Sequence, residues 1–293
     1  MRRLLWAAAA LALLVPGCRA AAREGQLVIV AMVYPLAWVA EQIAPDAAVT
    51  SLAAHGQDPH DQELTPQQRG LLEQAAVLAY VGDIGFQPQI EGAVAPGEGV
   101  VSAAEVVGPD ALLPLDDGEG ADPHFWFDAR LLAQVATALG EAAAQADDEH
   151  AAQYRSAAQR VAGELEAAAD NVDGMLNSCR HDTVIVGHEA FAYLLEPHGI
   201  TQQGISGAGG HSEASPADIA GLVTQIREQD LEAVLTEPVE GRTDAEAVAR
   251  EAGVDLIEIY SLDIVTDEQA AKGFPQLLRE QAQAAAQAAG CRP

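Results

Sequence analysis

Three of the eight histidines share one setting, in which each follows an expected strand or opens the next helix. His60 lies in "DPHD", His124 in "DPHFWFD" and His188 in "VGHEAF". Neutral imidazoles bind borderline metal ions such as zinc, at about 2.0–2.1 Å from each nitrogen. Proline precedes His60 and His124 and restricts the backbone, which lowers the entropy lost on metal capture. One such histidine would be read as a capping or core residue, but three together favour a metal site.

A tetrahedral site needs a fourth ligand, and two carboxylates at strand ends are candidates. Asp263 follows the expected strand "DLIEIY", and Glu237 in "LTEP" follows the strand before it. We expect Asp263 to be the ligand. Glu237 is either an alternative ligand or a carboxylate that orients one of the histidines from behind.

The elements that must position these residues are strands that alternate with helices. Strands are predicted at 26–33, "AVTSLA", "AVLAYVG", "TVIVG", "TQQGIS", "EAVLTE" and "DLIEIY", and Thr65 and Ser215, each followed by proline, are expected helix N-caps. Such alternation predicts parallel, helix-flanked sheets, in which ligands bind outside the carboxyl ends of the strands. Three histidines from two halves of the chain can therefore converge on one point.

The chain divides into five expected segments. Residues 1–17 read as a signal peptide and 18–25 as a tether; 26–130 and 180–293 form two α/β lobes, and 131–179 is helical. Within the helical segment we expect two helices with a break near "ADDEH", the second about 40 Å long. We also expect a helix from Glu189 and a terminal helix from about Glu268. The lobes would thus be bridged by a rigid helix instead of a flexible linker.

The first residues indicate export. Arg2 and Arg3 precede an apolar run too short to span a membrane, and Cys18 in "LVPGC" lies where lipoprotein signals are cleaved and acylated. The alternative is an ordinary cleaved signal with an incidental cysteine.

In an oxidising compartment we expect Cys179 and Cys291 to form a disulfide, although two separate thiols are not excluded by sequence.

The net charge of −29 excludes nucleic acid as a partner, because few cationic side chains are available to neutralise phosphates. A field of this sign attracts cations, although a need for solubility is enough to explain the acidic composition.

The other five histidines have ordinary settings. We interpret His150 and His198 as lying in helical, solvent-rich segments, and His181 as preceding a strand. His55 lies on the approach to His60, and His211 lies on a Gly-rich loop.

With these residues in view, the chain resembles the metal-binding lipoproteins of bacterial ABC importers for zinc and manganese, the ZnuA/TroA-like substrate-binding family. "PHDQELTP", "DPHFWFDARLLAQVA" and "VGHEAFAYLLEPHGI" look like its three histidine motifs, and "EASPADI" and "TEPVEGRTDAEAVAREAGV" fit its C-terminal lobe. The resemblance covers nearly the whole mature chain.

The resemblance implies two (β/α) lobes bridged by one rigid backbone helix, with a single metal ion in the cleft between them. The ion would be delivered to an ABC permease with its cytoplasmic ATPase by a monomeric receptor, anchored outside the cytoplasm by a lipid on Cys18. The three histidines of the family carry over to His60, His124 and His188. Zinc is the expected cargo and manganese the alternative, because nitrogen-rich ligation favours zinc.

Two features depart from the family pattern. An ungapped alignment puts Tyr260, not Asp263, where some members carry an acid, so Asp263 requires a small shift. The loop "PLDDGEGAD" before His124 is short and acidic, where many zinc-specific members have a long His-rich insertion.

Two other classes of function compete with transport. An exported zinc hydrolase also uses three histidines, but the sequence has no HExxH helix, GxSxG elbow or nucleophile paired with a base. A lipid-anchored adhesin would use the metal for stability alone, and such a protein should unfold when the metal is chelated.

Overall fold

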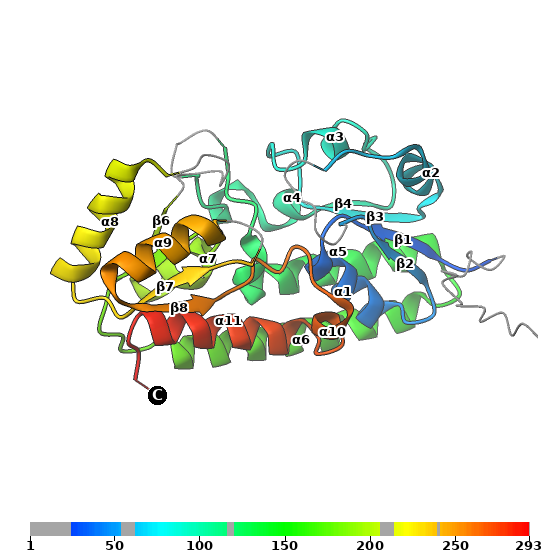
Figure 1. Ribbon diagram of the computed structural model, residues 1–293. Coiled ribbons are helices and arrows are strands. Elements are labelled where there is room, and N and C mark those ends of the chain that lie inside the picture. The colour runs from blue at the N-terminus through cyan, green and yellow to red at the C-terminus, as the bar shows by residue number, and fades with distance from the viewer. Residues whose placement is uncertain (1–24, 54–61, 116–119, 206–213, 239–240, 293) are drawn as a thin grey trace, which may run out of the picture.

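The computed structural model describes residues 25–53, 62–115, 120–205, 214–238 and 241–292. The expected signal segment, Cys18, His55, His60 and His211 lie outside the described residues. Figure 1 shows two parallel sheets, each with its own helices, lying side by side over a pair of long helices.

The N-terminal sheet has the strand order β2-β1-β3-β4, and all its strands are parallel. Val30 of the central strand faces Thr50 on one side and Leu78 on the other. The elements of this half are β1 (Val28–Ala31), α1 (Tyr34–Ile43), β2 (Ala48–Ser51), α2 (Pro66–Gln74), β3 (Val77–Tyr80), α3 (Pro88–Glu91), β4 (Val100–Ser102), α4 (Ala103–Val107) and the 3₁₀ turns Pro109–Ala111 and Phe125–Phe127.

The C-terminal sheet repeats this arrangement, with the order β6-β5-β7-β8 and parallel pairing throughout. Both sheets therefore place their strand ends at one edge, as the alternation of elements predicts. The elements are β5 (Thr183–Val186), α7 (Ala192–Leu195), the 3₁₀ turn Glu196–His198, β6 (Thr201–Gly204), α8 (Pro216–Glu228), β7 (Ala233–Thr236), α9 (Arg242–Ala252), β8 (Asp255–Glu258), α10 (Asp267–Ala270) and α11 (Phe274–Ala288).

Two antiparallel helices connect the halves, α5 (Ala129–Ala146) and α6 (Ala151–Met175). At 1.5 Å per residue, α6 is about 38 Å long, and it runs beneath both sheets with α11 beside it (Figure 1). The break between α5 and α6 falls at the predicted place. The helices pack closely at Gly140, where an added Cβ would overlap the Cβ of Ala158.

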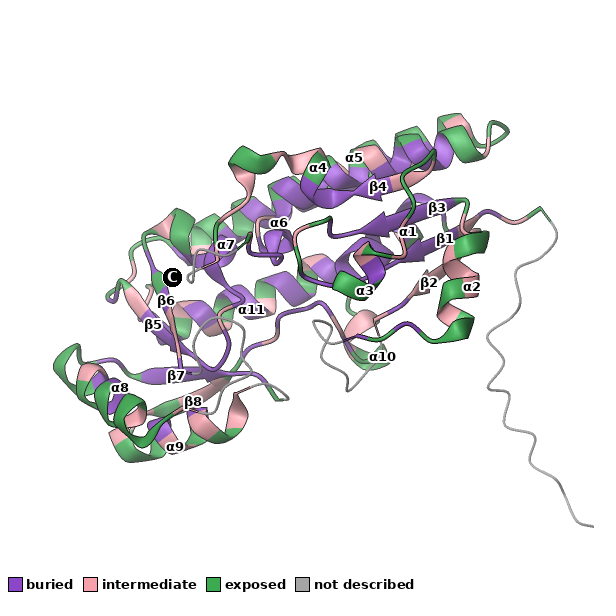
Figure 2. Ribbon diagram, turned by 90° about the horizontal axis from the view of Figure 1, so that it is seen from above, coloured by how far each residue is buried: buried purple, intermediate pink, exposed green. Residues whose placement is uncertain are grey.

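One hydrophobic cluster runs through both halves. It contains Ile29 of β1, Val186 of β5, Leu165 of α6 and Leu278 of α11. Figure 2 shows buried residues along the inner strands of both sheets, such as β1, β3 and β7, and on α5 and α11. Because apolar packing continues from one sheet to the other, the two halves are not separated by a flexible linker. The boundaries 26–130, 131–179 and 180–293 remain predictions.

The caps are confirmed, since the side chains of Thr65 and Ser215 each accept a hydrogen bond from the backbone amide of the third residue of the following helix.

The disulfide is also confirmed: Cys179 and Cys291 are bonded and close a loop of 112 residues. The chain-entropy model gives about 4–5 kcal/mol for such a loop. No helix in the described part of the chain is both long and apolar enough to cross a bilayer.

Two expectations about elements were wrong, and one strand was missed. The helix expected from Glu189 begins only at Ala192, because Gln202 Oε1 holds the Phe191 amide in a turn. The terminal helix expected from Glu268 is split into α10 and α11, since Gly273 has a φ of +80° and proline follows at Pro275. The short β4 was missed because three residues give too little periodicity.

Candidate metal centre

Most of the candidate residues lie at the strand-end edges that the fold creates. His188 follows β5 by one residue, Glu237 follows β7 directly, and Asp263 lies a few residues beyond β8. His124 comes from the other half of the chain, directly before the 3₁₀ turn Phe125–Phe127. All four side chains are buried, with His124 at 2 % and Asp263 at 4 % exposure.

A carboxylate two residues upstream holds His124. Asp122 Oδ1 accepts the backbone N–H of His124 at 2.9 Å and lies 2.7 Å from its Nδ1. The edges and faces of Phe86 and Trp126 surround the imidazole, with ring centroids 6.2 and 5.3 Å away. Because a carboxylate beside Nδ1 favours the tautomer with a proton there, Nε2 is the nitrogen that would ligate a metal.

His188 is held in the same way by Glu237. Its Nδ1 lies 2.8 Å from Oε2 of this carboxylate, and both side chains are buried. The other oxygen, Oε1, accepts the backbone N–H of Ser261 at 2.6 Å. Glu237 therefore lies behind His188, and its role as an alternative ligand or as an orienting carboxylate remains a prediction.

The two imidazoles meet although they come from different halves of the chain. Their ring centroids are 5.3 Å apart and the planes are nearly perpendicular, at 75°. Two rings that share a tetrahedral zinc at about 2.0–2.1 Å from each nitrogen have centroids roughly 5 Å apart. The spacing of the rings is thus already suited to a common ion.

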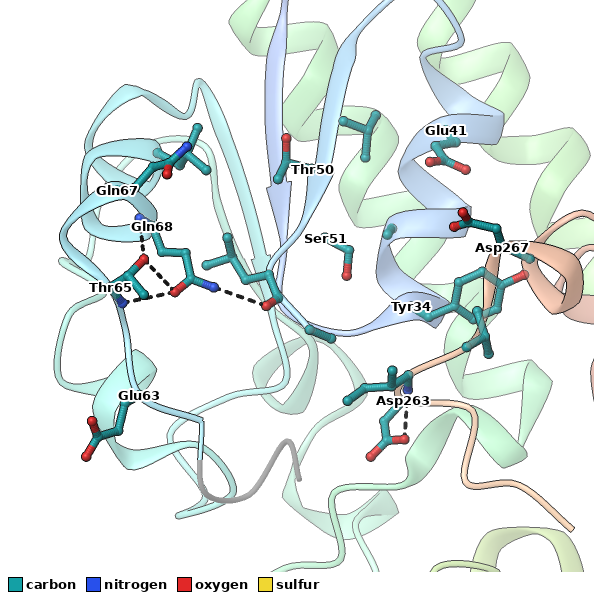
Figure 3. Close-up of a pocket in the computed structure, with 18 residues that line it drawn as sticks. Tyr34, Glu41, Thr50, Ser51, Glu63, Thr65, Gln67, Gln68, Asp263 and Asp267 are labelled. Carbon is teal, nitrogen blue, oxygen red and sulfur yellow. Dashed lines mark hydrogen bonds between the residues drawn. The ribbon is translucent and has the colours of Figure 1, made fainter. Parts of the chain in front are cut away.

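Ser261 joins Asp263 to this arrangement. Its hydroxyl donates to Asp263 Oδ1 at 2.7 Å. The same oxygen accepts the Ile264 amide at 2.8 Å (Figure 3). The carbonyl of Ser261 accepts the indole N–H of Trp126 at 2.7 Å. One serine therefore connects the carboxylate to the supports of both histidines.

Tyr193 of α7 connects the two halves by a second set of hydrogen bonds. Its hydroxyl accepts the Leu113 amide at 2.8 Å and donates to the Asp122 carbonyl at 3.1 Å. Burial raises the pKa of this phenol well above its usual value, so the hydroxyl remains protonated. The loop that carries Asp122 and His124 is in this way fixed from the opposite half.

His60, the first expected ligand, lies outside the described residues, but both sides of its segment are anchored. The side-chain amides of Gln62 and Gln68 donate to the carbonyl of Leu52, beyond the end of β2. Thr65 then starts α2 with a reciprocal capping box to Gln68. Among the described residues alone, no three His, Cys, Asp or Glu side chains form a metal-binding group.

Tyr260, the alternative to Asp263, does not share these contacts. Its amide donates to Gln281 and its hydroxyl to Glu258. His150 contacts Asp147 on the surface, as expected of a solvent-exposed histidine. The interpretation of His198 as solvent-rich was wrong: its side chain is 12 % exposed, because the turn after α7 packs it inward, and burial lowers its pKa.

Several residues of this centre were missed from the sequence. Asp122, Trp126 and Ser261 lie within two residues of an expected ligand, in "DPHFW" and "SLD". Their proximity to ligands was the available signal, since a ligating histidine usually has a carboxylate behind it. Tyr193 gave no local signal, because its partners are far away in the sequence.

Comparison with known proteins agrees with this architecture. Residues 29–288 match the family model described as "ZnuA: Zinc-uptake complex component A periplasmic". The chain is 25 % identical over 278 residues to the manganese-binding lipoprotein MntA of Halalkalibacterium halodurans, covering 92 % of each chain. It is 23 % identical over 293 residues to the high-affinity zinc uptake system protein ZnuA of Bacillus subtilis, covering 92 % of this chain and 91 % of that protein.

A solved structure shows the same fold. The periplasmic zinc-binding protein TroA from Treponema pallidum superposes with a TM-score of 0.81 at 21 % identity, covering 92 % of this chain and all of that one. The expected fold of two parallel-sheet α/β lobes is therefore confirmed.

Proposed function

Because the chain belongs to the ZnuA family of zinc-uptake components, we propose that it is the solute-binding protein of a metal ABC importer. It captures one divalent metal ion between its two halves and delivers the ion to a membrane permease that is driven by a cytoplasmic ATPase. Two relatives that cover 92 % of this chain are named as a manganese-binding lipoprotein and a high-affinity zinc uptake system protein.

The observation that supports this function best is the pair of buried imidazoles from different halves of the chain. His124 and His188 have their rings 5.3 Å apart, and each has a carboxylate at Nδ1. Carboxylate–histidine pairs of this kind raise the basicity of the ligating nitrogen and fix the ring orientation. An arrangement formed before the ion arrives loses little entropy on binding.

The ligand set that we propose is His60, His124, His188 and Asp263. Glu237 is assigned an orienting role, because one of its oxygens faces His188 and the other accepts the Ser261 amide. Three imidazoles and one carboxylate favour zinc, whereas manganese prefers more oxygen ligands. We therefore propose Zn²⁺ as the cargo, with Mn²⁺ as the competitor to be tested.

The proposed location is outside the cytoplasm. Arg2, Arg3 and the apolar run after them support export, and Cys18 supports a lipid anchor on the membrane. One acyl-anchored terminus leaves the folded body free to meet the permease. The protein is expected to act as a monomer and to have no enzymatic activity.

Zinc titration of the mature chain tests the proposal. Competition with a chromophoric chelator should give one tight site per chain, and His60→Ala, His124→Ala, His188→Ala and Asp263→Ala should each weaken it by about 100-fold or more. His150→Ala, which removes an exposed imidazole elsewhere, should leave the affinity unchanged. Tight binding that survives His124→Ala and His188→Ala together would refute the proposal.

Two further readouts separate the rival functions. The zinc-loaded chain should not hydrolyse esters, peptides or phosphoesters. The metal-free chain should remain folded and gain thermal stability when zinc is added, since a ligand of the native state stabilises by RT ln(1 + [L]/Kd). Chelator-sensitive turnover would indicate a hydrolase, and unfolding on chelation would indicate a structural metal.

A further inference from the structure

A pocket of about 650 Å³ lies next to Asp263, on the N-terminal half of the molecule. The end of β2 and the helices α1, α2 and α10 form its walls (Figure 3). Its described lining includes Glu41, Glu63, Asp263 and Asp267 and contains no lysine or arginine. A concave surface lined by one sign of charge concentrates ions of the opposite sign.

Tyr34 is a buried polar side chain in this pocket whose hydroxyl group has no hydrogen-bond partner among the described residues. The residue is 8 % exposed and begins α1. Figure 3 shows its ring on the α1 side of the pocket, near Asp267, with Glu41 on the same side. Buried hydroxyl groups are nearly always hydrogen-bonded, whereas for the Tyr34 hydroxyl group the described residues supply no partner.

The carboxylate of Glu41 influences the titration of Tyr34. Burial, together with the negative charge of Glu41, raises the pKa of the Tyr34 phenol well above its usual value. The carboxyl group of Glu41 is accessible to solvent, yet desolvation by the pocket walls raises its pKa as well. Both effects mean that negative charge is disfavoured here without a compensating positive charge.

A hydrated divalent cation meets these requirements. Its bound waters donate hydrogen bonds to carboxylates, and a neutral phenol oxygen also accepts from such a water. The phenol proton can then be donated to a neighbouring carboxylate. The pocket is large enough for an ion with its first shell of water, and it offers carboxylate oxygens instead of the buried imidazoles of the tight site.

We propose that Tyr34, Glu41 and Asp267 form an outer site that holds a hydrated divalent cation before the ion passes to Asp263. The outer site rests on the pocket alone, whereas the transfer step also rests on the proposed function. Asp263 lines this pocket and is connected through Ser261 and Glu237 to His188. The ion would thus lose its water stepwise between the two sites.

The outer site is tested with Mn²⁺ as a paramagnetic probe on the zinc-loaded chain, in which the tight site is filled. Amide signals of α1 and α10 should broaden at submillimolar Mn²⁺, and the broadening should be lost in E41Q/D267N. The matched control E73Q/D255N removes two exposed carboxylates outside the pocket and should keep the broadening. Broadening that avoids α1 and α10, or that persists in E41Q/D267N, would overturn the outer site.

The transfer step is tested by stopped-flow zinc binding to the metal-free chain. In E41Q/D267N the association and dissociation rates should both fall by roughly fivefold relative to E73Q/D255N. The outer site changes the route by which zinc reaches the tight site but not the free and bound states themselves. The Kd for zinc should therefore change less than twofold. Equal rates in the two double variants would overturn the transfer step. If the wild-type chain bound no zinc tightly, the proposed function would fail, while Mn²⁺ broadening at the pocket would still support the outer site.

Discussion

The indole N–H of Trp126 donates to the carbonyl oxygen of Ser261 at 2.7 Å, joining residues that are 135 positions apart in the chain. Trp126 packs against His124, and Ser261 contacts Glu237 and Asp263. This hydrogen bond thus links the supports of the two imidazoles directly. The candidate centre is a single buried network, and the predictions below address its parts and the scaffold that carries it.

The carboxylates behind the histidines should tune zinc affinity. Asp122→Asn and Glu237→Gln keep the size of the side chain but remove the charge at Nδ1, so each should weaken zinc binding by about 10–100-fold. Competition titration measures this effect. Asp128→Asn, at the half-buried N-cap of α5, is the control and should leave zinc affinity unchanged. A loss below threefold in both variants would mean that these carboxylates do not support a bound metal.

Trp126→Phe should affect both stability and metal binding. It keeps an aromatic ring but leaves the buried Ser261 carbonyl without its donor, which costs about 1–3 kcal/mol. Zinc affinity should fall about tenfold, because Ser261 also positions Glu237 and Asp263. Trp38→Phe trims a buried indole that packs on Phe274 at 5.9 Å. That control should lower the free energy of unfolding while sparing zinc affinity; equal zinc affinities in the two variants would contradict the network.

Two helical glycines should respond to alanine in opposite directions. Gly140→Ala puts a Cβ where α5 meets Ala158 of α6, so overpacking should cost about 1–3 kcal/mol of the free energy of unfolding. Gly163→Ala lies on the exposed face of α6 with open space around it and should stabilise by about 0.5–1 kcal/mol. Urea unfolding of the metal-free chain measures both. A stabilising Gly140→Ala would mean that α5 and α6 pack less closely than the structure shows.

His150 and His198 should have opposite effects on the pH dependence of stability. The hydrogen bond to Asp147 raises the pKa of His150, so its contribution is full below the unfolded-state pKa near 6.5 and is lost as pH rises through the folded-state value. Burial lowers the pKa of His198, so its contribution is present above about 6.5 and is lost as pH falls through the lowered value.

The corresponding substitutions can be compared by thermal unfolding with chelator present. His150→Gln should be less stable than wild type at pH 5.5 and close to it at pH 8. His198→Gln should gain stability relative to wild type on going from pH 8 to pH 5.5. Parallel pH profiles for both variants would show that neither shift influences folding.

Much of the scaffold could be predicted from the chain alone. The apolar runs "VIVA" and "TVIV" are too β-branched for helices, and Thr65 and Ser215 mark helix starts, so the alternation of strands and helices follows from local chemistry. The position of His188 after a strand and of His124 at an expected helix start also pointed to one shared edge. His60 and the lipid anchor at Cys18 remain predictions.

The rest depended on contacts between distant residues. Nothing local in "YSLD" says that Ser261 uses its amide, its carbonyl and its hydroxyl on three partners, since those partners come from both halves of the chain. The split between α10 and α11 required a glycine at positive φ next to Trp38. The sequence by itself determined which residues can ligate a metal, because ligand chemistry is a property of the side chain. Only the tertiary structure decided that two of these rings lie 5.3 Å apart and which groups hold them, because those distances are set by packing across the molecule.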